Sequence, residues 1–304
     1  MDWFEKIFGF KETLNSIDEN IIINNEKLFS KYNNTEFHMG TLEVISIGDL
    51  RKKLPEPTWV MNVSSVIGDI AAIHEDYPDA TIQVASQFNL LEMMSPKNHS
   101  GQGITKYIFD RTQGPICAMK CAAGTLYRNY FTQIDTLSKI KSLFPDHYWD
   151  MINGYALFQK NDLLKLNNLI QNNHLIQEKI IANLEVGIQW DTEVIGFNHN
   201  VTQVYCSAIP VSYHNGIHSS EFAPFAKLIL EATYEAAFMA AVLNEKSNKL
   251  FLTFVGGGAF GNDMEWILSA IEKNLKKFED FELDVVLVSY GSVPQKVKEL
   301  TEKY

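Results

Sequence analysis

The sequence has few cysteines and no zinc-binding pattern. It contains three cysteines in 304 residues, and a small, odd number is typical of a reducing compartment, where disulfides are rare. Cys117 and Cys121 would lie one helical turn apart, but no histidine pattern completes a zinc site around them. We expect these two and Cys206 to be buried small hydrophobic residues. The expectation is a cytoplasmic protein without a metal site.

Long apolar runs and a basic stripe are also missing. No segment is long and apolar enough to span a bilayer, and the first 14 residues, MDWFEKIFGFKETL, carry acids where a signal peptide would be basic and apolar. The formal net charge of −11 argues against a nucleic-acid-binding face. An anionic small ligand stays compatible with this charge, because backbone N–H groups act locally. We therefore expect neither a membrane nor a nucleic acid among the partners.

Linkers, repeats and low-complexity tracts are absent too. The length permits one large domain or two, and a hydrophobic content of 46% is ample for a full core. Without a proline-rich or glycine/serine-rich linker, one elaborated domain over residues 1–304 is the simpler interpretation. In it, residues 1–57 form an N-terminal cap, mostly helical over residues 2–36. Residues 58–291 form the core, with a helical insertion at about residues 133–184.

The apolar segments that are present indicate an α/β fold. A buried strand at residues 58–66, a short helix starting at residue 71 and a second buried strand at residues 81–86 form a parallel βαβ pattern. Further strands are expected at residues 186–195, 202–209, 250–255 and 283–290, and helices at residues 104–111, 160–171, 175–184, 225–243 and 263–278, with a break at 114–115 and a charged, frayed helix at 294–304.

The stretch LFLTFVGGGAFGN at residues 250–262 is the most informative one. A short apolar strand leads into Gly256, Gly257 and Gly258, which allow a sharp turn and a close approach to the main chain. Asn262 is a suitable N-cap for the helix that follows. A glycine loop that enters a helix presents free N–H groups and a positive dipole end, which suits a phosphate. The alternative is a tight turn without a ligand.

Polar residues also follow the first two strands of the core. Asp69 and Asn89 come where open α/β sheets bind ligands, beyond the carboxyl ends of the strands. The structural alternatives are a helix N-cap for Asp69 and a turn residue for Asn89.

Three motifs, in this order, resemble the macro domain superfamily. They are the Ile67-Gly68-Asp69-Ile70 element, the strand VASQFN that ends at Asn89, and the loop GGGAFG at residues 256–261. The combination with the segment DRTQGP is similar to a divergent branch of the family. That branch includes a bacterial effector hydrolase that removes ADP-ribose from modified ubiquitin.

The resemblance implies a macro-domain-like three-layer α/β/α fold with a mixed, largely parallel central sheet, extended by N-terminal and mid-chain helices. It implies that Asp69 and the N–H of Ile70 read the adenine, that Asn89 contacts the distal ribose, and that Phe260 packs beside this ribose. Residues 101–105, GQGIT, stand where the family has a glycine-rich stretch. The ligand-binding residues expected in this way are Asp69, Ile70, Gly103, Ile104, Thr105, Gly256, Gly257, Gly258, Ala259, Phe260, Gly261 and Asn262.

Hydrolysis of an ADP-ribosyl linkage places an oxocarbenium-like charge on C1″ of the distal ribose. A carboxylate stabilises this charge or aligns a water, and an acid protonates the leaving group. Asp110 is the first candidate, because it follows residues 103–105. Glu92, three residues after Asn89, is the second. The alternative for Asp110 is a surface ion pair with Arg111 or another base.

Two functions agree with these residues. One is an ADP-ribosyl hydrolase acting on a modified protein, with ubiquitin or an arginine linkage as the substrate considered; ADP-ribose is its ligand and product, and no cofactor is required. The other is a non-catalytic ADP-ribose reader, which needs the same contacts without an acid at C1″. A nicotinamide-dependent oxidoreductase is disfavoured, because no early strand leads into a GxGxxG loop.

Overall fold

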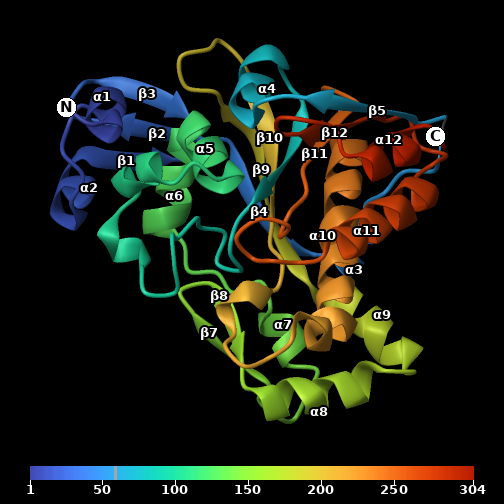
Figure 1. Cartoon of the computed structure of the whole chain (residues 1–304). Helices are drawn as coiled ribbons and strands as arrows, with labels where there is room; N and C mark the ends of the chain where they lie inside the picture. Colours follow the sequence, from blue (N-terminus) through green and yellow to red (C-terminus); the bar gives the residue numbers. More distant parts are fainter. Residues whose placement is uncertain (58–59) are drawn as a thin grey trace.

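A mixed seven-stranded sheet forms the centre of the molecule (Figure 1). The computed structural model describes residues 1–57 and 60–304. The strand order is β4-β9-β10-β6-β11-β12-β5. The strands are β4 (Thr41–Ser46), β5 (Asn62–Ile67), β6 (Thr81–Ala85), β9 (Glu185–Glu193), β10 (Asn200–Cys206), β11 (Lys249–Leu252) and β12 (Asp284–Ser289).

Most of this sheet is parallel. β10, β6, β11, β12 and β5 run in one direction, and β9 is antiparallel to both β10 and β4. The fold class expected from the sequence is confirmed. The expected strand at residues 58–66 begins at Asn62, and its residues 58 and 59 lie outside the described part of the chain.

Helices cover both faces of the sheet and give three layers (Figure 1). On one side lie α4 (Ile70–Asp76), α5 (Gln113–Lys120) and α6 (Ala122–Phe131); on the other lie α10 (Ala223–Leu243), α11 (Met264–Lys277) and α12 (Gln295–Thr301). Because both faces of the sheet are covered, its central strands are buried on both faces, polar residues such as Gln83 included. In β6, the first four of five residues are fully buried. The largest hydrophobic core lies between the sheet and α10, which is buried along nearly its whole length.

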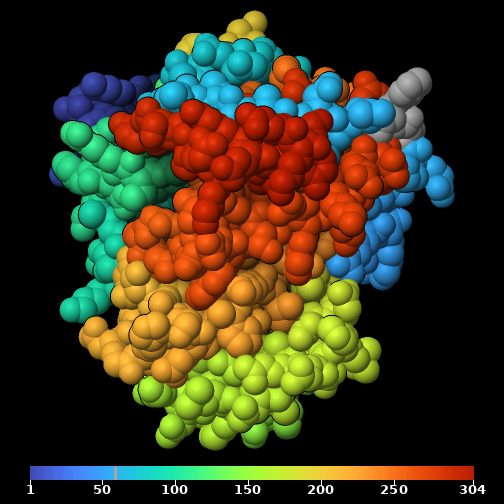
Figure 2. Space-filling view, turned by 45° about the vertical axis from the view of Figure 1, so that its right-hand side comes forward, coloured from blue at the N-terminus to red at the C-terminus, as the bar shows by residue number. Residues whose placement is uncertain are grey.

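The C-terminal helix is docked on the sheet rather than frayed. Val297 and Leu300 of α12 are buried, and the helix packs against β5. Figure 2 shows the C-terminal segment (red) lying beside the light-blue segment that contains β5. Burial of these two apolar side chains stabilises α12, although the many charged residues of this segment had suggested a frayed helix.

The N-terminal segment is only partly helical, so the expectation for residues 2–36 was wrong. The helices α1 (Trp3–Phe8) and α2 (Leu14–Asn20) are followed by an antiparallel sheet of β1 (Ile21–Asn24), β2 (Lys27–Ser30) and β3 (Thr35–His38). Three consecutive isoleucines favour a strand over a helix. Asn25 then has φ = 52° and Asn34 has φ = 56°, the left-handed turn conformation that asparagine tolerates.

The mid-chain insertion contains the two helices expected from the sequence, α8 (Lys160–Ile170) and α9 (His174–Asn183). It also contains the short helix α7 (Ser138–Lys141) and a hairpin of β7 (Trp149–Ile152) and β8 (Tyr155–Phe158), which were not expected. The hairpin turns at Asn153 and Gly154, with φ = 48° and 85°, as an Asn-Gly turn requires. These elements lie together at one end of the molecule (Figures 1 and 2).

The helix expected at residues 104–111 is the shorter 3₁₀ helix η2 (Thr105–Phe109). The break expected at residues 114–115 was wrong. Gly114 and Pro115 do not break a helix but lie in the first turn of α5, where proline removes no hydrogen bond that the helix needs. The remaining helices are α3 (Ile47–Arg51) and the 3₁₀ turns η1 (Ser100–Gln102), η3 (Val211–Tyr213) and η4 (Ser219–Phe222).

Candidate active site

A cavity of about 660 Å³ opens at the carboxyl ends of the parallel strands. Its wall includes the residues that directly follow β5, β6, β11 and β12, and α5 closes one side. This edge is where open α/β sheets bind ligands. The volume lies within the range of about 300–1,000 Å³ that is typical of small-molecule sites.

Asp69 lies just beyond the carboxyl end of β5 and caps the helix that follows. Its Oδ1 accepts the N–H of Ala71 at 2.9 Å, so it is the N-cap of α4. Asp69 and Ile70 both line the cavity. Asp69 can therefore cap α4 and still face a ligand in the cavity.

The glycine loop after β11 contributes Gly256, Gly258, Ala259 and Phe260 to the cavity. Gly256 has φ = +82°, and a Cβ there would lie 2.5 Å from the Cβ of Ala208, so this position requires glycine. At Gly258, a Cβ would have no heavy atom within 4 Å. The loop thus presents bare main chain to the cavity.

Two other glycines of this loop lie outside the cavity wall. A Cβ at Gly257 would lie 3.0 Å from Cδ1 of Ile267, and a Cβ at Gly261 would lie 1.9 Å from Oγ of Ser212. Both positions therefore serve the packing of the loop, and the wall of the cavity includes neither of them.

Asn262 is not the N-cap of the following helix, as the sequence had suggested. Asp263 caps α11 by accepting the N–H of Glu265 at 2.8 Å. Asn262 is buried, and its Nδ2 donates to the carbonyl oxygens of Ile209 at 2.9 Å and Gly256 at 3.2 Å. It fixes the loop from inside and does not line the cavity.

Glu92 is the most unusual group in the cavity wall. Its side chain is only 2% exposed, and neither carboxyl oxygen has a hydrogen-bond partner among the described residues. Burial raises the pKa of Glu92 to about 8, and the nearby positive charge of Arg128 and the hydroxyl group of Tyr107 oppose this rise only in part. At neutral pH this carboxyl group therefore holds a proton, as a general acid must.

Asp110 also lines the cavity, and it is half-buried. Its Oδ1 accepts the N–H of Thr112 at 2.9 Å and the Thr112 hydroxyl at 2.7 Å. Both bonds fall on one oxygen, which leaves Oδ2 for a water or a substrate. No ion pair joins Asp110 to Arg111 among the described residues, so the surface-pair alternative is wrong.

Arg111 is a cavity residue that the sequence did not single out as a ligand. It is exposed and lines the cavity where α5 begins. The acidic residues of the wall are Asp69, Glu92 and Asp110. Arg111 is the positive charge that this wall offers to an anion.

The start of α5 is fixed to the sheet by Gln113. Its Oε1 accepts the N–H of Ala85 at 2.6 Å, and its Nε2 donates to the carbonyl oxygen of Gln83 at 2.8 Å. Gln113 therefore continues the pairing of β6 beyond the short strand β11 and holds this wall of the cavity in place.

Asn89 lies outside the cavity wall. Its Oδ1 accepts the N–H of Leu91 at 3.1 Å, and a Cβ at Gly154 would lie 2.4 Å from that oxygen. The structure thus gives Asn89 the role of a turn residue packed on the β7–β8 hairpin.

Gly103, Ile104 and Thr105 lie outside the wall as well. The N–H groups that were expected to bind a ligand donate instead to the carboxylate of Glu12, from Ile104 at 2.8 Å and from Thr105 at 2.7 Å. The partner is 92 residues away in the chain, so the sequence gave no local signal for it.

Three aromatic side chains line the cavity together, and the sequence had predicted Phe260 among them. Phe260 lies 5.5 Å from Tyr155 and 5.7 Å from Tyr213, and the two tyrosine rings lie 5.0 Å apart, all as centroid distances. All three line the cavity. Tyr155 comes from β8, so the mid-chain insertion contributes to the site.

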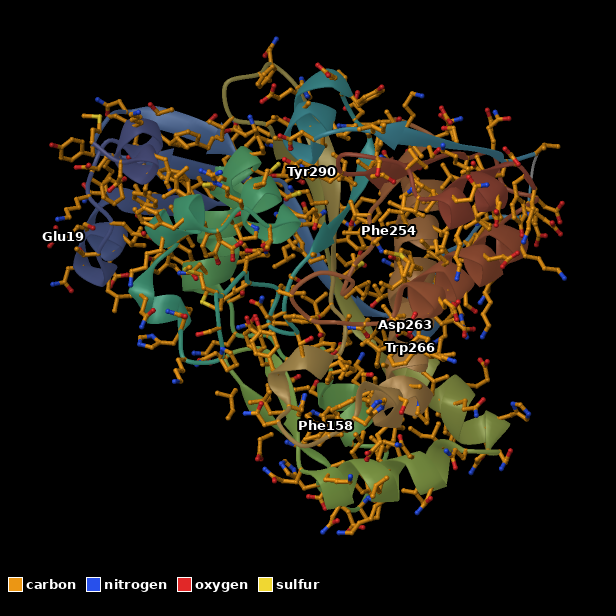
Figure 3. All side chains as sticks on the ribbon, viewed as in Figure 1. Glu19, Phe158, Phe254, Asp263, Trp266 and Tyr290 are labelled. Atoms are coloured by element: carbon orange, nitrogen blue, oxygen red, sulfur yellow. The ribbon has the colours of Figure 1, made fainter. Side chains whose placement is uncertain are left out.

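Two further aromatic residues line the cavity. Phe254 follows β11 and Tyr290 follows β12, which are neighbouring strands (Figure 3). The side chain of Tyr290 is 90% exposed. An exposed aromatic ring at the rim of a pocket offers an apolar face to a ligand.

No group of three or more His, Cys, Asp or Glu side chains in the described chain could hold a metal ion. Over the same residues, no helix combines the length and the apolar character that crossing a membrane would require.

Comparisons with known proteins give a structural likeness alone. No family model matches the sequence, and no curated protein matches it. Among solved structures, the chain is similar to poly(ADP-ribose) glycohydrolases. The enzyme from Thermomonospora curvata is 11% identical over 92% of this chain and 94% of that chain, with a TM-score of 0.48. The enzyme from Deinococcus radiodurans in complex with ADP-ribose is 12% identical over 85% and 90%, with a TM-score of 0.45. Scores at this level carry no argument about activity, which depends on the cavity itself.

Proposed function

We propose that this protein binds ADP-ribose in the cavity and hydrolyses the bond between its distal ribose and a modified protein. The observation that carries the proposal is the unpartnered carboxyl group of Glu92, which is buried and protonated at neutral pH, in one cavity with the carboxylate of Asp110. A binding module needs no such group, and a buried carboxyl group without partners is costly to maintain.

The cavity provides a suitable surface for each part of ADP-ribose. Asp69 and Tyr290 lie where the adenine would bind, since one offers a polar edge and the other an aromatic face. The main chain at Gly258 and the guanidinium group of Arg111 suit the diphosphate. The distal ribose would then lie against the aromatic wall that contains Phe260.

The two carboxyl groups divide the work of hydrolysis. As the bond between C1″ and the leaving atom breaks, its electron pair moves to that atom, which takes the proton of Glu92. The carboxylate of Asp110 stabilises the positive charge on C1″ and orients a water molecule. The water oxygen bonds to C1″, and Asp110 receives the proton that the water loses. This is the acid and carboxylate pair that glycoside hydrolysis requires.

The test is release of free ADP-ribose from a panel of mono-ADP-ribosylated proteins with arginine, serine and acidic linkages, ubiquitin included. We expect turnover on at least one linkage, and a loss of about 10²–10⁴-fold in kcat for Glu92→Gln and for Asp110→Asn. Both variants should still bind ADP-ribose. Binding without turnover by the wild-type protein on every linkage would favour the non-catalytic reader.

A further inference from the structure

The carboxylate of Glu12 is enclosed by donors from a distant part of the chain. It accepts the N–H groups of Ile104 at 2.8 Å and Thr105 at 2.7 Å, and the Tyr130 hydroxyl at 2.6 Å. The hydroxyl of Thr105 is a fourth donor to it. Four donors on one carboxylate make a strong anchor, because hydrogen bonds to a charged acceptor are about twice as strong as neutral ones.

The Glu12 carboxylate can come this close to the main chain only because residue 103 is a glycine. A second contact supports the same arrangement. Gly103 has φ = +80°, and a Cβ there would lie 2.5 Å from Oε2 of Glu12. A side chain at position 103 would therefore displace the carboxylate. In addition, Nε1 of Trp3 in α1 donates to the carbonyl oxygen of Thr105 at 2.8 Å. The N-terminal segment thus binds both the N–H groups and a carbonyl group at the start of η2.

The helix η2 that begins there connects to both carboxyl groups of the cavity. The hydroxyl of Tyr107, within η2, accepts the main-chain N–H of Glu92 at 3.2 Å. Asp110 is the C-cap of η2, and its N–H donates to the carbonyl oxygen of Tyr107 at 3.0 Å. The N-cap residue of η2 provides no side-chain hydrogen bond of its own, so Glu12 supplies the cap from outside.

We infer that Glu12 is a positioning residue for the hydrolytic reaction, acting through η2 on Glu92 and Asp110. The N-terminal segment is then a working part of the site rather than a cap over the core. This inference rests on the proposed function. Asp69, Tyr290 and Gly258 lie on other elements, and among the residues assigned to the adenine and the diphosphate Arg111 is the one that adjoins η2. Glu12 therefore affects the chemical step more than the affinity for ADP-ribose.

The experiment compares Glu12→Gln with the matched control Glu19→Gln. Glu19 is exposed on α2, at the outer edge of the N-terminal segment (Figure 3), and its side chain makes no hydrogen bond or ion pair with residues 1–57 or 60–304. We expect Glu12→Gln to lower kcat at least tenfold with a Kd for ADP-ribose within about threefold of the wild type. Amide hydrogen exchange over residues 100–112 should become faster. Glu19→Gln should change none of these quantities.

A second variant covers the case in which Glu12→Gln fails to fold. Thr105→Val removes only the hydroxyl donor and keeps both main-chain bonds to Glu12. We expect a smaller fall in kcat, about threefold, again without a change in Kd. In a double variant the two losses should not add, because both act on the same contact.

Two outcomes would overturn the inference in different ways. If exchange becomes faster in Glu12→Gln but kcat stays within twofold of the wild type, Glu12 is a structural anchor only and the proposed function stands. If the wild-type protein releases no ADP-ribose from any carrier, the proposed function fails and this inference fails with it.

Discussion

The hydroxyl of Tyr107 accepts the main-chain N–H of Glu92 at 3.2 Å, and both groups are buried. This bond joins the segment that ends at Asp110 to the loop that carries the second carboxyl group. The bond thus links Glu92 and Asp110, the two catalytic candidates, through Tyr107, although 17 residues lie between them in the chain.

Tyr107→Phe should therefore lower stability and turnover together. The N–H of Glu92 would stay buried without a partner, which costs about 1–3 kcal/mol. We expect a lower free energy of unfolding by this amount and a lower kcat, both measurable on purified protein. The matched control is Tyr127→Phe, since the hydroxyl of Tyr127 makes no hydrogen bond among the described residues and its ring stacks on Phe131. If the two variants lost stability and turnover equally, the hydrogen bond between Tyr107 and Glu92 would not have the proposed role.

The raised pKa of Glu92 predicts the pH dependence of activity. If the protonated side chain is the general acid, kcat/KM should fall as the pH rises above about 8, where Glu92 loses its proton. A pH–rate profile of the wild type measures this limb directly. A profile that stays flat to pH 10 would remove Glu92 from the acid role.

The same pKa predicts how stability depends on pH. Because folding raises the pKa of Glu92 from 4.5 to about 8, the folded state holds a proton that the unfolded state loses. The stabilisation is complete below about pH 4.5 and is lost as the pH rises to about 8. Relative to Glu92→Gln, the wild type should lose up to about 1.4 kcal/mol per pH unit in this range. Chemical denaturation at several pH values checks it.

Arg111 should supply the counter-charge for the diphosphate. Arg111→Gln should weaken ADP-ribose binding roughly 10- to 100-fold, since a charge-assisted hydrogen bond contributes about 1.5–3 kcal/mol. It should also reduce the salt dependence of the Kd. Lys106→Gln is the control, because Lys106 is exposed on η2 and does not line the cavity. An unchanged Kd for Arg111→Gln would place the diphosphate elsewhere.

A buried ion pair outside the site predicts a separate stability effect. Glu235 of α10 accepts Nε of Arg51 at 2.6 Å and a second guanidinium nitrogen at 2.8 Å, and Nζ of Lys277 at 2.6 Å. Burial raises the pKa of Glu235, but the hydrogen bonds from both cations outweigh burial and lower it. Its stabilising effect is therefore present above the unfolded pKa and is lost as the pH falls through the folded one.

Glu235→Gln should cost roughly 1–3 kcal/mol at neutral pH. This is less than for a wholly buried pair, because both cations stay partly exposed. The difference from the wild type should shrink as the pH falls below the ordinary glutamate pKa of 4.5. Glu231→Gln, which breaks the more exposed pair with Lys273, should cost less than about 1 kcal/mol. Thermal or chemical unfolding of the three proteins measures this difference.

The strands of the central sheet, the long helices and the glycine loop could be predicted from the sequence, because their signals are local, whereas the strands of the two smaller sheets were missed. Apolar runs gave the sheet, and Gly256 and Gly258 do line the cavity. The environment of Glu92 could not be predicted, since its burial and its lack of partners arise only when α5 and η2 pack on the loop. The contact of Glu12 with residues 104–105 and the place of Tyr155 depend on segments that meet only in the folded chain.

Calorimetric titration of the wild type with ADP-ribose tests the central claim most directly, with NAD and AMP as comparisons. We expect ADP-ribose to bind more tightly than AMP. Gly258→Asp should lose this binding, because the new side chain has room but brings a negative charge to the diphosphate. Ser269→Asp, on the exposed side of α11, should bind as the wild type does. No heat of binding to the wild type, or equal binding by Gly258→Asp, would contradict the claim that this cavity is an ADP-ribose site.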